Sequence, residues 1–135
     1  MEIQEELKEL ESKENLLLDK SFAFALRIVR LRKYLISDAP HKEYDISKQL
    51  LRSGTSIGAN AEEAQGAQST TDFIAKLSIA YKEARESRYW VRLLEGAGYL
   101  DSAMGSSLLT DIDELCKILS RILLTSKSRL QKGGY

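Results

Sequence analysis

Residues 101–126, DSAMGSSLLTDIDELCKILSRILLTS, carry the clearest structural signal in the 135-residue chain. Apolar side chains recur there every three or four residues, which is the spacing of one face of an α-helix. This row consists of Leu108, Leu109, Ile112, Leu115, Cys116, Leu119, Ile122 and Leu123. Asp101 or Ser102 stands before the first turn, where a side-chain oxygen can accept from a free backbone N–H group. The pattern predicts an amphipathic helix with a cap at its start.

Three further amphipathic segments precede this one. Residues 69–96 open with Ser69 and Asp72 at capping-box spacing, and their apolar row is Phe73, Leu77, Ala80, Ala84, Ser87, Val91 and Leu94. Residues 45–66 repeat the pattern with Ile46, Leu50, Leu51, Gly54, Ile57, Gly58, Ala61 and Ala64. We expect the first helix over residues 20–37, with Asp19 as its N-cap, and a loop around Pro40, because proline cannot continue a helix.

The first predicted helix has two apolar rows. We assign one row to the core: Phe22, Ala25, Leu26, Val29 and Ile36. The second row lies on another side of the helix: Phe24, Ile28, Leu31 and Leu35. A helix with two apolar sides needs two neighbours, so we expect the second row to contact another subunit. Trp90, one position off the core row of its helix, is a further candidate for that interface.

The composition agrees with a helical domain. Hydrophobic residues make up 43% and charged residues 30%, and the chain has one proline and eight glycines. We find no strand pattern and no internal repeat. Four amphipathic helices with short connections predict an all-α, antiparallel up-down four-helix bundle. We expect the bundle over residues 15–126, after an acidic N-terminal arm over residues 1–14 and before a frayed C-terminal tail over residues 127–135.

Several classes of function are excluded or disfavoured by the residue counts. The chain has one cysteine, Cys116, and one histidine, His41, so a zinc site with two cysteines or a disulfide within one chain is impossible. We expect no catalytic residues, metal or cofactor, and no small-molecule substrate is evident. No run of about 18 apolar residues is present to cross a membrane, and the charged N-terminus lacks the features of a signal peptide. We therefore expect a cytoplasmic protein that is not an enzyme and has no membrane partner.

Two features of residues 52–63 need an explanation. Gly54 and Gly58 lie inside a predicted helix, where each costs about 1 kcal/mol relative to alanine. We interpret Gly54, Ile57, Gly58 and Ala61 as a motif for close helix packing, since a phosphate-binding loop would need a Lys-Ser or Lys-Thr pair. A polar stripe runs beside the motif: Arg52, Ser56, Asn60 and Glu63. The stripe is either a hydrogen-bonded row or a binding surface for a polar ligand or partner.

Basic and aromatic side chains provide a candidate nucleic-acid contact. Arg85, Arg88, Arg92 and Tyr89 share a face with Tyr81, and Arg27 and Arg30 lie on the first helix. Guanidinium groups bind phosphates, and aromatic rings stack on the bases of single-stranded RNA. Alternatively these residues form a solvated face with intrahelical ion pairs to neighbouring glutamates. Because twenty basic residues balance twenty acidic ones, any RNA contact must be local.

Several segments together resemble a known family. They are residues 48–60 (KQLLRSGTSIGAN), Glu63-Ala64, residues 69–73, Ile79-Ala80, Glu86 and residues 98–100. Over about residues 16–125 the chain is similar to the bacterial four-helix-bundle family named for the 23S rRNA intervening-sequence proteins. The resemblance implies an up-down bundle that assembles into a homopentameric ring without established enzymatic activity. We therefore expect a non-enzymatic scaffold that interacts with itself and with RNA or a protein.

A related branch provides the alternative function. It contains accessory proteins of diversity-generating retroelements, which engage a reverse transcriptase and nucleic acid through a strongly basic surface. The alternative is thus direct RNA or nucleic-acid binding, or a reverse-transcriptase accessory role. The net charge of zero departs from the pattern of that branch.

Overall fold

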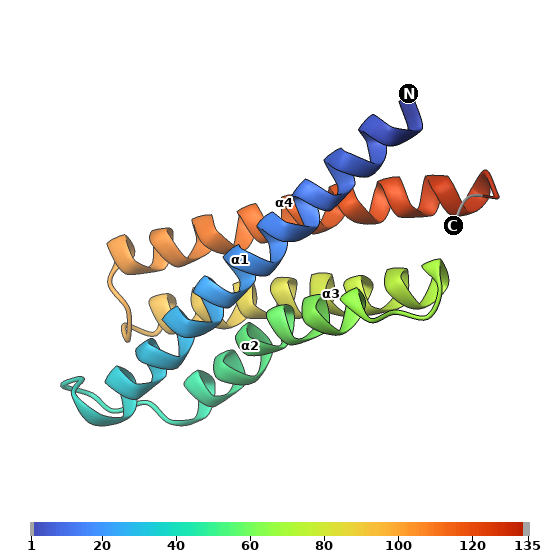
Figure 1. Cartoon of the computed structure of the whole chain (residues 1–135). Coiled ribbons are helices and arrows are strands. Elements are labelled where there is room, and N and C mark those ends of the chain that lie inside the picture. The colour runs from blue at the N-terminus through green and yellow to red at the C-terminus, as the bar shows by residue number, and fades with distance from the viewer. Residues whose placement is uncertain (1, 134–135) are drawn as a thin grey trace.

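The computed structural model describes residues 2–133 and is all-α over that range. Its four helices are α1 (Glu2–Ser37), α2 (Asp45–Gln65), α3 (Thr70–Gly96) and α4 (Ser102–Gln131). They pack as a bundle in which α1 and α3 each contact α2 and α4. Figure 1 shows the α1–α2 and α3–α4 connections at one end of the bundle and the α2–α3 connection at the other. None of the described helices is both long and apolar enough to span a membrane.

The caps of α3 and α4 are those that the sequence predicts. The Ser69 hydroxyl accepts a hydrogen bond from the backbone N–H of Asp72 at 3.0 Å. The Asp72 carboxylate in turn accepts from the backbone N–H of Gln68 at 3.2 Å. At α4, the Asp101 carboxylate accepts from the backbone N–H of Met104 at 2.8 Å. Both caps satisfy N–H groups that have no partner within the first helical turn.

The start of α2 is capped in a different way, by a side chain that the sequence pattern does not predict as a cap. The Glu43 carboxylate accepts from the backbone N–H groups of Asp45, Ile46 and Ser47 at 3.0, 2.9 and 2.6 Å. The Ser47 hydroxyl donates to the Glu43 carbonyl at 2.8 Å. The buried Glu43 carboxylate thus caps the N-terminus of α2, and its negative charge lies at the positive end of the helix dipole.

The ends of α1 and α4 differ from the prediction. α1 begins at Glu2 and runs for 36 residues, so Asp19 lies inside a helix and is not its N-cap. The acidic arm is helical from Glu2 onward, because residues 2–37 lack proline and glycine and are rich in helix-forming Glu, Lys and Leu. α4 continues to Gln131, so most of the expected frayed tail is helical. Residue 1 of the arm and residues 134–135 of the tail lie outside the described residues.

The two apolar rows of α1 exchange the roles that we predicted. The row Phe24, Ile28, Leu31 and Leu35 is buried within a single chain, with no member more than 9% exposed. The prediction that these four residues contact another subunit is therefore wrong: they form part of the bundle core. α1 packs this row over Gly54 of α2, where the missing side chain lets the two helices approach closely.

The row that we assigned to the core lies on the outside. Phe22 is 67% exposed, Val29 46% and Leu26 39%, while Ala25 and Ile36 are half-buried. These three exposed residues are called the outer row of α1 below. The isolated chain therefore leaves an apolar face on α1 uncovered.

Candidate functional site

The glycines of α2 mark a close contact with α1. A Cβ placed on Gly54 would lie 3.1 Å from Cγ1 and 3.2 Å from Cγ2 of Ile28. A Cβ on Gly58 would lie 3.3 Å from the Ser21 hydroxyl oxygen and 3.5 Å from the Ser21 backbone. Ile57 and Ala61 are fully buried in the core beside them. These glycines serve helix packing, because α1 approaches α2 closely at both positions.

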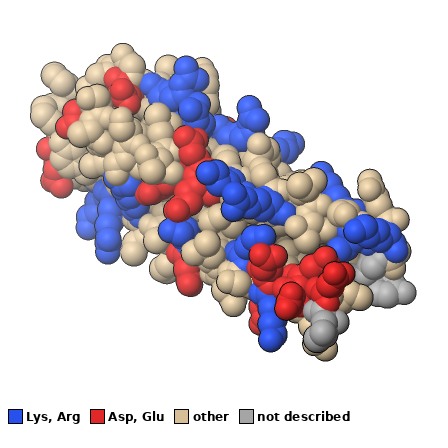
Figure 2. Space-filling model, turned by 90° about the horizontal axis from the view of Figure 1, so that it is seen from above, with Lys and Arg blue, Asp and Glu red and all other residues tan. Residues whose placement is uncertain are grey.

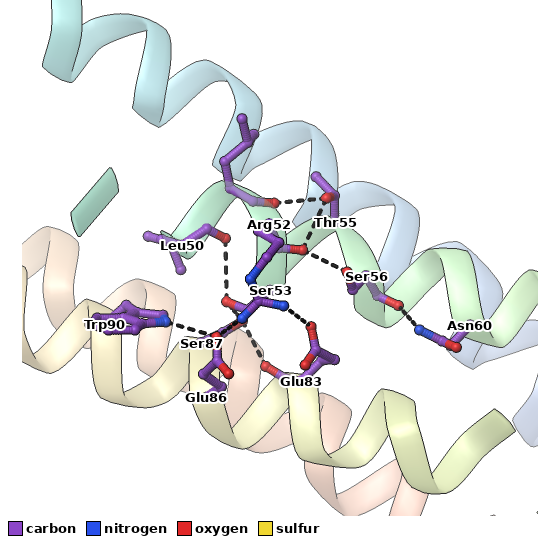
Figure 3. A network of polar contacts seen from close by, with 11 residues as sticks. Leu50, Arg52, Ser53, Thr55, Ser56, Asn60, Glu83, Glu86, Ser87 and Trp90 are labelled. Atoms are coloured by element: carbon purple, nitrogen blue, oxygen red, sulfur yellow. Dashed lines mark hydrogen bonds and ion pairs between the residues drawn. The ribbon is translucent and has the colours of Figure 1, made fainter. Parts of the chain in front are cut away.

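The polar stripe of α2 lies along the seam with α3 (Figure 3). The Arg52 guanidinium forms ion pairs with Glu83, at 2.9 Å, and with Glu86. Glu86 also accepts a hydrogen bond from the indole Nε1 of Trp90 at 3.0 Å. The Trp90 side chain, a predicted interface residue, is half-buried and makes its polar contact within the chain.

The other three residues of the stripe also have partners within the chain. The Ser56 hydroxyl donates to the Arg52 carbonyl at 2.7 Å, and the Asn60 amide donates to the Ser56 carbonyl at 2.8 Å. The Glu63 carboxylate pairs with Lys76 of α3 at 3.5 Å. This geometry supports the interpretation of the stripe as a hydrogen-bonded row: Arg52 and Glu63 join α2 to α3, whereas Ser56 and Asn60 bond within α2.

One polar contact in this seam is not predicted by the sequence patterns. The hydroxyl oxygens of Ser53 and Ser87 are 2.8 Å apart, and both side chains are fully buried (Figure 3). The Ser87 hydroxyl also contacts the Glu83 carbonyl at 2.9 Å and the Ser53 hydroxyl the Leu50 carbonyl at 3.5 Å, so either serine can donate to the other. The pair satisfies two buried polar groups that would be costly to leave without partners. The sequence feature that could have indicated this pair is a serine on the core-facing side of each helix.

Four of the candidate nucleic-acid residues lie together in a groove of about 420 Å³ between α3 and α4. Its lining is Tyr81, Arg85, Arg88, Tyr89, Arg92, Asp113 and Cys116. Arg88 pairs with Asp113 of α4 at 3.1 Å. Arg85 and Arg92 are exposed and form no ion pair or hydrogen bond with another residue in the range 2–133. This surface is called the basic groove below.

Cys116 lies on the wall of the basic groove and is half-buried. Burial raises the pKa of the Cys116 thiol, and the nearby Asp113 carboxylate raises it further. Arg85 and Arg88 act in the opposite direction but do not reverse the shift. The thiol is therefore held in its protonated form, which is the weak nucleophile and the weak metal ligand. No group of three His, Cys, Asp or Glu side chains within the described residues is arranged to hold a metal ion.

The remaining two candidate residues, Arg27 and Arg30, belong to α1, which packs against α4 on the side away from the basic groove. The Arg27 guanidinium pairs with Asp111 at 2.8 Å and donates to the Ser107 hydroxyl at 2.8 Å. Side chains two residues apart on a helix do not face the same way, so Asp111 and Asp113 hold their arginines on different sides of α4. The predicted nucleic-acid residues thus form two separate sites. Figure 2 shows acidic and basic side chains along the whole of the face that it presents.

Comparison with known proteins places the chain in a family. The family model for the 23S rRNA-intervening sequence protein matches residues 13–121. A crystal structure of a protein of unknown function from the S23 ribosomal protein family of Bacteroides thetaiotaomicron VPI-5482 is 48% identical, with a TM-score of 0.79. That match covers 82% of this chain and 97% of the other. No significant match is found among curated proteins. The family match spans most of the chain, which therefore belongs to the 23S rRNA-intervening sequence protein family.

Proposed function

We propose that this protein is a non-enzymatic scaffold: an antiparallel up-down bundle whose copies assemble into a homopentameric ring and present repeated surfaces to RNA or a protein partner. The observation that carries the proposal is the outer row of α1, where Phe22, Leu26 and Val29 are exposed on one helix face. Contiguous exposed apolar surface marks an interaction site in a folded protein. The placement of the three connections at alternating ends supports the antiparallel arrangement.

A second apolar patch lies on α3. It consists of Tyr89 and Leu93, which lie one turn apart, and of Ile79, which lies about 15 Å farther along the helix; all three are exposed. Since α1 and α3 do not contact one another within the described bundle, the two patches belong to different sides of the molecule. Two unlike faces that bind one another give a head-to-tail contact, and such contacts close into a ring when the rotation permits. We therefore assign the outer row of α1 in one copy to the α3 patch of the next.

The energetics require both patches in each contact. Complete burial of an exposed Phe, Leu or Val side chain contributes about 1.5–3 kcal/mol, and the outer row of α1 is already partly covered. Its three residues alone would hardly offset an association cost of about 4 kcal/mol or more. Joining them to the α3 patch doubles the apolar surface that is removed from water. Closure of a ring then adds stability, because every copy makes two contacts.

A pair of variants tests the head-to-tail arrangement. Val29→Asp disables the α1 face, and Leu93→Asp disables the α3 face, each with a charge on an already exposed position. Each variant alone should be a folded monomer by circular dichroism and light scattering. An equimolar mixture should form a dimer, because one copy keeps an intact α3 patch and the other an intact α1 row.

Ser120→Asp, at an exposed position of α4, is the matched control and should assemble like the wild type. Dissociation by Val29→Asp combined with normal assembly of Leu93→Asp would contradict the pairing of unlike faces. Normal assembly of both variants would contradict the proposed interfaces altogether.

Direct RNA binding is the second candidate, and the basic groove is the observation that favours it. Arg85 and Arg92 are not engaged by any described acidic side chain, and Tyr81 and Tyr89 stand beside them. The role of a reverse-transcriptase accessory protein would use the same surface but has less support, since the net charge is zero. Filter binding of ribosomal RNA fragments over a salt series tests this function. The Arg85→Gln, Arg92→Gln variant should lower the salt slope by about 2, and a flat salt response of the wild type would exclude the function.

A further inference from the structure

A second groove, of about 390 Å³, lies between α1 and α4 at the end of the bundle where residues 97–101 connect α3 to α4 (Figure 1). α1 contributes Arg27, Arg30, Leu31 and Tyr34, and the opposite wall consists of Tyr99, Leu100, Asp101, Met104 and Leu108. The first turns of α4 carry mostly small side chains, over residues 102–107 (SAMGSS), so they cannot fill the space against α1. The volume is within the range of small-molecule sites, about 300–1,000 Å³.

The floor of this groove is apolar and its sides are aromatic. Leu31, Leu100 and Leu108 form the floor and are buried parts of the core. Tyr34 and Met104 are exposed at the edge, and Tyr99 is half-buried. Flat aromatic faces and a polarisable thioether pack well on a planar ring. A rigid leucine floor with such sides therefore fits a flat apolar group.

The groove is lined by two arginines and one aspartate, and of these three only Arg27 forms an ion pair within the described residues. The Arg27 guanidinium is held by Asp111, and the Asp101 carboxylate accepts from the backbone N–H of Met104. Arg30, however, is exposed and makes no ion pair or hydrogen bond with another of residues 2–133. The hydroxyl groups of Tyr34 and Tyr99 likewise donate to no residue in that range. An open guanidinium beside two free hydroxyl groups favours an anionic group.

We propose that this groove binds a small amphipathic anion, a flat apolar ring that carries one anionic group. The ring lies on the leucine floor between Tyr34 and Tyr99, and the anionic group pairs with Arg30. A nucleoside monophosphate and an aromatic carboxylate both have this chemistry. The groove lies between α1 and α4, and its Arg30 is one helical turn from Leu26 of the outer row. Sequence patterns do not indicate this site, since its two walls are about seventy residues apart in the chain.

Titration of the full-length 15N-labelled chain, followed by TROSY spectra, tests the site. The probes are adenosine monophosphate and indole-3-acetate, each paired with its neutral analogue, adenosine and indole-3-acetamide. We expect saturable shifts at the amides of Tyr99, Leu100 and Met104, with the better anion binding about tenfold more tightly than its neutral analogue, which is about 1.4 kcal/mol. The anion that binds more tightly shows whether the groove prefers a nucleoside monophosphate or an aromatic carboxylate.

Variants show whether Arg30 recognises the anion. Arg30→Gln should remove the preference for the anionic probe and leave the binding of the neutral analogue unchanged. Arg85→Gln, which changes another exposed arginine in the basic groove, should keep the preference. Absence of saturable shifts with both anions at millimolar concentration would overturn the proposal. Shifts confined to the basic groove, or an unchanged preference in Arg30→Gln, would also overturn it.

Discussion

Replacement of Gly54 by alanine should destabilise the bundle, although alanine is the better helix former. The added Cβ would lie 3.1 and 3.2 Å from the two Cγ atoms of Ile28 and 3.4 Å from the Phe24 ring. Both neighbours are at most 2% exposed, and a close-packed core gives them little room to move. Overpacking costs about 1–3 kcal/mol, while the gain in helix propensity is about 1 kcal/mol. The expected net loss is therefore about 1 kcal/mol.

Urea denaturation followed by circular dichroism measures this loss. All variants are compared at one protein concentration, because self-association would add to the apparent stability. Gly96→Ala is the matched control: a Cβ there meets nothing within 4 Å, so the substitution should be neutral or stabilising. In an Ile28→Ala background, which lacks both Cγ atoms, Gly54→Ala should become stabilising. The reasoning is refuted if Gly54→Ala stabilises the otherwise wild-type protein as much as Gly96→Ala does.

Three other predictions concern polar side chains that are buried, as Ser87 is, or half-buried, as Glu14 and Cys116 are. Ser87→Ala should cost about 1–3 kcal/mol, because the Ser53 hydroxyl loses its 2.8 Å partner. In a double-mutant cycle the Ser53→Ala, Ser87→Ala protein should lose less than the sum of the single variants, and additive losses would speak against the pair. Burial raises the pKa of the Glu14 carboxyl in the folded chain, so the wild type should lose stability as pH rises from the ordinary carboxyl pKa through the raised one. Glu14→Gln should lack this loss and be the more stable protein at neutral pH, and superimposable pH profiles would count against it. Since burial also raises the pKa of the Cys116 thiol, iodoacetamide should alkylate the folded protein more slowly than the urea-unfolded protein at the same pH; equal rates would contradict this.

The sequence was sufficient for the parts of the fold that depend on local pattern. Helices α2, α3 and α4 each have one apolar row, and the caps at Ser69 and Asp101 are short-range contacts with a known residue preference. The core-facing row of α1 could not be chosen in this way, because both of its rows are apolar. The choice between them depends on which row meets Gly54 of α2, and that is a tertiary contact.

The candidate sites also divide into residues that share one helix, which sequence spacing groups correctly, and residues from different helices, which it does not. The four candidate residues of α3 in the basic groove, Arg85, Arg88, Tyr89 and Arg92, were predicted to lie together from their spacing on one helix. Arg27 and Arg30 had no such relation to that helix, and the structure places them in a different groove. The Ser53 and Ser87 pair and the walls of the α1–α4 groove likewise join residues from distant helices. Single-sequence patterns do not define such pairings.

Association through the outer row of α1 is tested most directly by sedimentation velocity of the wild type and of Val29→Asp at low micromolar concentration. We expect the wild type to sediment as one species with a multiple of the 15.2 kDa chain mass, and Val29→Asp to sediment as a folded monomer. A folded wild type that sediments at 15.2 kDa at every concentration would show that Phe22, Leu26 and Val29 stay in contact with water. That result would contradict the proposed assembly.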